Sequence, residues 1–130
     1  MKATAKLKSV PMSVRKMRLV VDLIRGKEIE DALDILRFTN KEAALWLEKA
    51  LISAVANWEH KLDGEESADD YDLVISEIFA DQGAQMKRFR PAPHGRAHRI
   101  RKHSCHVTLV VENRYALPSE ENEEAEVAEA

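Results

Sequence analysis

The sequence holds little cysteine and few aromatic residues, and both shortages limit what the chain can be. Cys105 is the only cysteine among 130 residues, so no disulfide can form within the chain, which fits a reducing compartment. Aromatic residues make up 5% of the sequence, so a core must depend on Leu, Ile, Val and Ala. No apolar run approaches the roughly 20 residues that cross a bilayer, and the basic N-terminus lacks the apolar stretch of a signal peptide. We therefore expect a soluble, intracellular protein of one domain.

Acidic side chains are absent from residues 82–111, although the whole chain carries a formal net charge of −3. The centre of this stretch, residues 86–103, reads MKRFRPAPHGRAHRIRKH. It contains three histidines and seven permanent cations, namely Lys87, Arg88, Arg90, Arg96, Arg99, Arg101 and Lys102. A ligand feels the local field before the average one, so an acid-free segment in an acidic protein is suited to binding a polyanion.

Charge is distributed along the chain in four blocks. Residues 1–27 carry eight Lys or Arg and one Asp, whereas residues 28–81 carry four Lys or Arg and fifteen Asp or Glu. The acid-free stretch follows, and residues 112–130 carry one Arg and seven Glu. Two basic blocks thus flank an acidic middle. We expect the domain to end near residue 116 and the acidic, aromatic-free segment 117–130 to be a disordered tail.

Helical periodicity predicts three helices in the first half of the chain. Ser13 is the expected N-cap of the first helix, and Gly26 is expected to end it. A shorter helix is predicted over about residues 28–37. The third is predicted to begin with a capping box formed by Thr39 and Glu42, and its many alanines suit close packing against a neighbouring element.

Strand patterns occur at residues 3–8, 71–80 and 105–111. A basic connector of 24 residues separates the last two, which is unusually long for a turn. Its length fits if the connector continues both strands as a hairpin arm over about residues 82–104. Each side of the arm would then reach on the order of 35 Å at about 3.3 Å per residue. Such an arm cannot bury its own backbone, so its tip is expected to be mobile until it meets a partner.

Arginine outnumbers lysine five to two in the arm, and this bias favours nucleic acid over a membrane surface. A planar guanidinium can contact phosphate through two hydrogen bonds. A membrane-binding segment needs more bulky apolar side chains than the three that the arm offers. The alternative is a solvated basic loop, but the length, the single sign of charge and the flanking strands favour binding.

A second basic patch lies in the N-terminal block, where the first predicted helix and the preceding strand carry cations with almost no acidic partners. An amphipathic helix explains part of this pattern, and a bound anion explains the rest. The candidate anion-binding residues in this patch are Lys6, Lys8, Arg15, Lys16, Arg18 and Arg25, and they join the seven cations of the arm.

The histidines and Cys105 suggest neither a metal site nor an active site. Their spacing fits no common structural zinc site, and no carboxylate lies near His98 or His103 in the sequence to orient an acid–base pair. We predict no cofactor, no metal and no enzymatic activity. Besides a non-enzymatic protein that binds a polyanion through the arm, two other classes remain open. One is an architectural DNA-binding protein with a β-arm, and the other is an RNA-processing enzyme that uses the arm histidines.

Over roughly residues 3–114 the chain resembles the large-subunit ribosomal protein L twenty-two family, of bacterial type. The similarity rests on motifs that occur in the family's order: SVRKMRLVVDLIRGK (13–27), AVANWEH (54–60), KRFRP (87–91), GRAHRIRK (95–102) and HVTLVV (106–111). Residues that match the family pattern in the arm are Lys87, Arg88, Gly95, Arg96, Arg99, Ile100 and Lys102. The chain departs from it at Arg90, Ala92, His94, Arg101 and His103.

The resemblance implies an α+β fold in which three helices pack on a small antiparallel sheet and a long basic β-hairpin protrudes. It implies a cytoplasmic protein of the large ribosomal subunit that binds ribosomal RNA and aids its assembly. Neighbouring large-subunit proteins and the nascent peptide would be further partners, and no membrane is involved. The hairpin would line the peptide exit tunnel with a tip formed by Arg90, Pro91, Ala92, Pro93, His94, Gly95 and Arg96.

Overall fold

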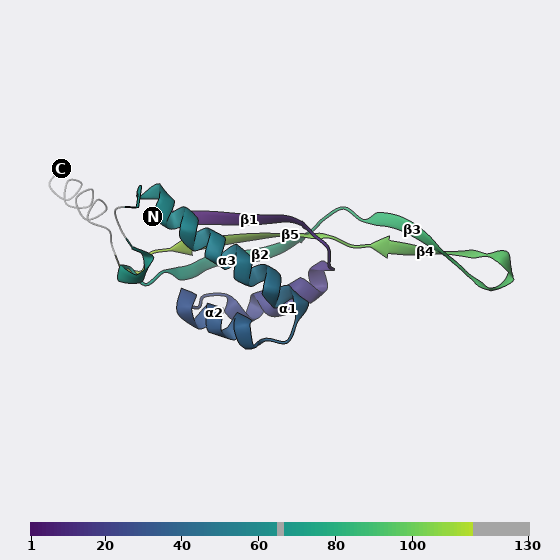
Figure 1. Cartoon of the computed structure of the whole chain (residues 1–130), viewed down its shortest axis with the longest axis horizontal. Coiled ribbons are helices and arrows are strands. Elements are labelled where there is room, and N and C mark those ends of the chain that lie inside the picture. Colours follow the sequence, from purple (N-terminus) through teal and green to yellow (C-terminus); the bar gives the residue numbers. More distant parts are fainter. Residues whose placement is uncertain (65–66, 116–130) are drawn as a thin grey trace.

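The protein combines a three-stranded antiparallel sheet, three helices and a two-stranded arm (Figure 1). The computed structural model describes residues 1–64 and 67–115, so the predicted acidic tail, 117–130, lies outside the described residues. In the sheet, β5 (Cys105–Glu112) lies between β1 (Lys2–Val10) and β2 (Val74–Gln82). The fold is therefore α+β, as the resemblance implied.

The three helices form where the apolar periodicity predicted them. They are α1 (Val14–Ile24), α2 (Ile29–Phe38) and α3 (Glu42–Lys61). The Ser13 hydroxyl accepts a hydrogen bond from the Lys16 backbone N–H at 3.4 Å, so the predicted N-cap of α1 is confirmed. Gly26 follows the C-cap of α1 with a φ of +75°, a backbone conformation that a side chain would strain.

The predicted capping box at the start of α3 is wrong. Lys41 is the N-cap of α3, and it makes no side-chain cap hydrogen bond. Thr39 is instead the C-cap of α2, and its hydroxyl donates to the Ile35 carbonyl at 2.6 Å. Thr39 directly follows α2, so its hydroxyl caps the C-terminal end of α2 and not the start of α3.

The strand predicted over 71–80 begins later, at Val74. A short 3₁₀ turn, η1 (Ala68–Asp70), precedes it, and Asp72 has a φ of +44° that no strand residue adopts. The first strand extends beyond the predicted 3–8, because its pairing with β5 runs from Lys2 to Val10 with one irregularity after Leu7.

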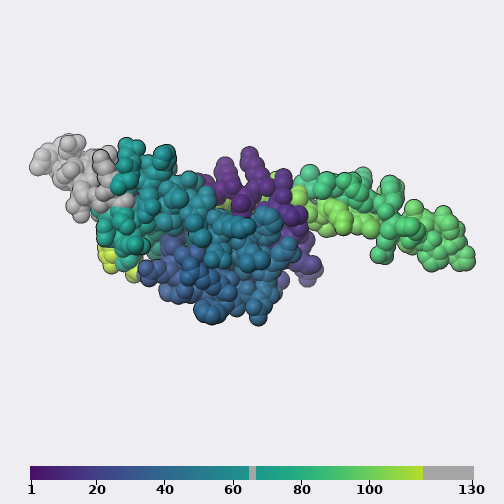
Figure 2. All heavy atoms as spheres, viewed as in Figure 1, coloured from purple at the N-terminus to yellow at the C-terminus, as the bar shows by residue number. Residues whose placement is uncertain are grey.

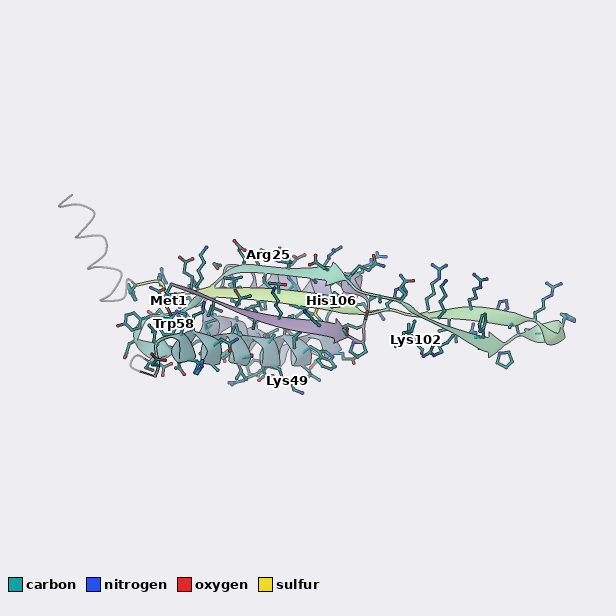
Figure 3. All side chains as sticks on the ribbon, turned by 90° about the horizontal axis from the view of Figure 1, so that it is seen from above. Met1, Arg25, Lys49, Trp58, Lys102 and His106 are labelled. Carbon is teal, nitrogen blue, oxygen red and sulfur yellow. The ribbon has the colours of Figure 1, made fainter. Side chains whose placement is uncertain are left out.

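The core lies between the helices and one face of the sheet. Alternate residues of β5 from Cys105 to Val111 are buried, while their neighbours are only half-buried. Buried alanines of α3 such as Ala44 and Ala54 belong to this core, where their small side chains allow close packing. Trp58 is fully buried with its ring centroid 5.7 Å from that of Tyr71. In Figure 3 the helices lie on one side of the sheet. Burial of each large apolar side chain between them contributes about 1.5–3 kcal/mol to stability.

Both edges of the sheet have backbone carbonyls that accept hydrogen bonds from helix side chains. Along β2, the Arg25 guanidinium donates to the Ile78 carbonyl and the Arg18 guanidinium to the Ala80 carbonyl, each with a shortest distance of 3.1 Å. Along β1, Asn57 donates to the Thr4 carbonyl at 3.1 Å and Lys61 to the Lys2 carbonyl at 2.6 Å. Unpaired edge groups are templates for pairing with another chain, so these bonds protect the sheet as well as anchoring α1 and α3.

The arm continues the ladder between β2 and β5. After the Gln82–Cys105 pair, the Gly83 N–H donates to the Ser104 carbonyl at 2.9 Å. Two residues then lie between Gly83 and Met86, whereas only one lies between Lys102 and Ser104, which is the arrangement of a β-bulge. Beyond the bulge, β3 (Met86–Pro91) pairs with β4 (Ala97–Lys102), and the 3₁₀ turn η2 (Pro93–Gly95) lies at the tip.

Gly83 is required where the arm leaves the body. A Cβ at this position would lie 2.6 Å from the Ser104 hydroxyl oxygen and 3.1 Å from Nε2 of His106. That hydroxyl donates to the Ala84 carbonyl at 2.6 Å. The close approach thus allows Ser104 to join both sides of the arm at its base.

We predict that Gly83→Ala lowers the free energy of unfolding by about 1–3 kcal/mol, because the new methyl group displaces the Ser104 hydroxyl. Urea unfolding followed by circular dichroism measures this loss. In a Ser104→Ala background, which removes the closest contact, the same substitution should cost less. An equal cost in both backgrounds would contradict this role for the contact.

Candidate nucleic-acid interface

The paired strands of the arm carry cations on both faces. Side chains alternate along a strand, and the register places Met86 opposite Lys102 and Pro91 opposite Ala97. One face therefore presents Arg88, Arg90 and Lys102, and the other presents Lys87, Arg99 and Arg101. Of the predicted arm cations, only Arg96 lies outside the strands, at the tip.

Neither face of the arm is covered by the described part of the protein. Every residue of β3 and β4 is exposed except Ile100, which is half-buried. Phe89 and Met86 are 69% and 57% exposed, and Figure 2 shows the arm extending clear of the body. Both faces are therefore free to contact a partner at the same time.

Like charges face each other across the ribbon. Lys87 lies directly opposite Arg101. Such cross-strand pairs are destabilising. In residues 1–64 and 67–115, no arm cation is joined to a carboxylate, and the ion pairs Arg25–Asp22, Arg37–Glu48 and Arg114–Glu28 lie in the body. The arrangement leaves positions that external anions can occupy on both faces.

The tip is a tight loop closed by a hydrogen bond from the Ala92 N–H to the Arg96 carbonyl at 2.8 Å. His94 and Gly95 both have left-handed backbones, with φ values of +63° and +66°. A left-handed conformation suits glycine but is uncommon for histidine. Figure 1 places the loop at the end of the arm farthest from the body, and its side chains are exposed apart from half-buried Ala92.

The N-terminal basic patch divides into two groups. Arg15 and Lys16, on the first turns of α1, are exposed and make no side-chain hydrogen bond in the described structure. Arg18 and Arg25 are instead bonded to the carbonyls of β2. The sequence alone placed all these cations in one patch. It could not show that Arg18 and Arg25 bond to carbonyls more than 50 residues away in the chain.

The lysines of β1 extend this patch along the strand. Lys6 lies opposite Thr108 on the face of the sheet that carries no helix, and its side chain is exposed. Lys8 is also exposed, but it lies within the irregularity between Leu7 and Val10, where strict alternation is interrupted. The Ser9 N–H there donates to Nδ1 of His106 at 3.0 Å, which ties the irregular segment to β5.

The fold brings the two basic patches together at the base of the arm. A groove there is bounded on one side by the segment that leads into α1 and by Lys16 in the first turn of α1. On the other side it is bounded by residues at the base of the arm, including Arg88 and Lys102. Figure 3 shows Lys102 at the base of the arm, at the end of the body opposite to Met1. This groove was not predicted, because its two walls are far apart in the sequence.

The described residues offer no group of three or more His, Cys, Asp or Glu side chains that could hold a metal ion. Cys105 is fully buried, and burial raises the pKa of its thiol above the ordinary value, which keeps it protonated and unreactive. Over the same described ranges, no helix has the length and apolar character needed to cross a membrane.

Comparison with known proteins covers both basic patches and the arm. A model of the family described as Ribosomal protein L22p/L17e matches residues 5–112. A protein named Large ribosomal subunit protein uL22 from Bacteroides fragilis is 56% identical over 110 residues, which cover 85% of this chain and 79% of that protein. Proteins of the same name from Flavobacterium johnsoniae and Porphyromonas gingivalis are 56% and 55% identical, and each alignment covers more than four fifths of this chain and 79% of the relative. The chain belongs to the L22p/L17e family of ribosomal proteins.

Proposed function

We propose that the protein is a structural constituent of the large ribosomal subunit in the cytoplasm and that it binds large-subunit ribosomal RNA through its arm and its N-terminal basic patch. The family is structural rather than enzymatic, and the relatives are named as large-subunit proteins. The observation that carries RNA binding is the ribbon with three cations on each face and no acidic partner among the described residues.

Double-stranded RNA offers this ribbon a suitable partner. RNA duplexes offer a protein phosphates, 2′-hydroxyls and shape more readily than base edges. A thin ribbon with cations on both faces can lie between two RNA helices and reduce the repulsion between their backbones. Assembly would benefit, since one arm then joins segments that are distant in the RNA sequence.

The arm also fits a position along the peptide exit tunnel, as the family resemblance implies. Its body end is fixed by the Ser104 and Gly83 hydrogen bonds, and its exposed tip lies far from the helices. The tip residues from Arg90 to Arg96 would then face the nascent peptide. Neighbouring large-subunit proteins would contact the body.

Sedimentation of a cell lysate through a sucrose gradient tests the proposal as a whole. The full chain should migrate with large subunits after a wash with moderate salt. Recovery only in the unbound fractions would reject it. Migration with DNA, abolished by a DNase and not by an RNase, would favour the architectural DNA-binding alternative.

Two triple variants test whether both faces of the arm contact phosphate. Lys87→Ala/Arg99→Ala/Arg101→Ala and Arg88→Ala/Arg90→Ala/Lys102→Ala should each flatten the slope of log affinity against log salt by about 2–3, at roughly 0.7–0.9 per phosphate contact. Filter binding of a large-subunit RNA fragment provides the measurement. The charge-matched control Arg37→Ala/Lys41→Ala/Lys49→Ala, on the body, should leave the slope unchanged. An effect from only one arm face would contradict a ribbon held between two RNA surfaces.

Two double variants on α1 separate structural cations from RNA-binding ones. Arg18→Ala/Arg25→Ala should lower the free energy of unfolding by about 1 kcal/mol, because the β2 carbonyls lose their donors. Arg15→Ala/Lys16→Ala should change stability by less than about 0.5 kcal/mol but weaken RNA binding and flatten its salt dependence. Chemical unfolding and filter binding measure the two effects. Equal stabilities for the two variants would refute the division of the patch.

A further inference from the structure

The groove at the base of the arm combines apolar and cationic walls. Pro11, Met12 and Lys16 line it on the body side, and Met86, Arg88 and Lys102 line it on the arm side. Its cavity volume is about 690 Å³, within the range of roughly 300–1,000 Å³ typical of sites for small organic molecules. A site of this size exceeds what one phosphate group requires.

The cations of the groove have no acidic partner among the described residues. Lys16 and Lys102 make no side-chain hydrogen bond there, and the Arg88 guanidinium donates only to its neighbours, the Lys87 carbonyl and the Met86 sulfur at 3.8 Å. With Arg101, which also lines the groove, these cations lie on both of its walls. The complementary ligand therefore carries negative charge.

The methionines of the groove set a second requirement for its ligand, which is an apolar or aromatic part. Met12 is half-buried, and Met86 is 57% exposed although it stands among cations. A thioether is flexible and polarisable, and it packs well against aromatic rings. A paired RNA helix presents phosphates and hydroxyls but keeps the faces of its bases stacked. Within an RNA, an unpaired nucleotide offers both a phosphate and an accessible aromatic ring.

We propose that the groove holds one unpaired nucleotide of the RNA, with its base against Met12 and Met86 and its phosphate near Lys16, Arg88 and Lys102. This inference rests on the proposed RNA-binding function and adds a single-nucleotide site to it. The arm wall is held in place before binding, because Ser104 joins both sides of the arm at its base. The Ser9 N–H bond to Nδ1 of His106 ties the chain next to the body wall to β5. A site formed in advance costs less free energy to occupy.

Methionine oxidation provides a direct test with internal controls. The purified full chain is treated with hydrogen peroxide, and mass spectrometry follows sulfoxide formation at each methionine. The probes are an RNA hairpin with a one-nucleotide bulge, made with each of the four bases, and the same hairpin without the bulge. Met1 lies at the opposite end of the body (Figure 3) and Met17 is fully buried, so neither should respond to RNA.

At least one bulged RNA should slow oxidation of Met12 and Met86 more than the unbulged hairpin does, and it should leave Met1 unchanged. Equal protection by bulged and unbulged RNA would overturn the nucleotide site. Saturation with all four bulged RNAs without protection of Met12 and Met86 would also overturn it. Failure of the proposed function has a different signature, which is no salt-dependent binding of any probe.

Affinity measurements with substituted chains add an independent readout. Met12→Ala/Met86→Ala should weaken binding of the preferred bulged RNA by about tenfold, near the lower end of what stacking one base contributes. Binding of the unbulged hairpin should not change. Met86→Ala alone, on the exposed arm, leaves the core intact and should show part of the loss. The control Leu19→Ala/Leu23→Ala, exposed on α1 outside the groove, should bind both RNAs normally. An equal loss for both RNAs, or none, would reject the site.

Discussion

Electrostatic repulsion within the arm is the constraint on which the rest of the structure depends. Each face of the ribbon carries three cations, and Lys87 lies opposite Arg101. A two-stranded hairpin is marginal in water even without such charges. The arm is stabilised when the body holds its base and when anions balance its charge. The protein supplies the first condition, and the RNA supplies the second under the proposed function.

The body is built as a support for this arm. The strands β2 and β5 continue into it through the Gly83–Ser104 hydrogen bond, so the core beneath them also fixes the base of the arm. Arg18 and Arg25 bond to the Ala80 and Ile78 carbonyls of β2, which hinders pairing of that edge with another chain. The bulge beyond Gly83 marks the boundary between two strand pairs. The β2–β5 pair is buried on one face, whereas the β3–β4 pair is exposed on both faces.

Local chemistry allowed the sequence to predict the main elements. The apolar spacing located all three helices, and Ser13 and Gly26 were correctly assigned because caps depend on neighbouring residues. The capping box at Thr39 was wrong because the same hydroxyl could serve either of two adjacent helix ends, and only the fold decides between them. The late start of β2 depends on the backbone of Asp72, which composition does not reveal.

Long-range contacts explain what the sequence could not show about the candidate site. Charge counts identified the arm and the N-terminal patch, but they could not separate Arg18 and Arg25 from Arg15 and Lys16. That distinction depends on β2 carbonyls distant in the chain. The division of the arm cations between two faces needed the register of β3 against β4. The groove containing Met12 and Met86 exists only after the N-terminal segment and the arm meet.

Electron cryomicroscopy of large subunits that contain this chain tests the central claim most directly. Phosphate oxygens should lie within hydrogen-bonding distance of cations on both faces of the ribbon, including the position between Lys87 and Arg101. An arm with RNA phosphates against one face only, and with the other face open to solvent, would contradict the account.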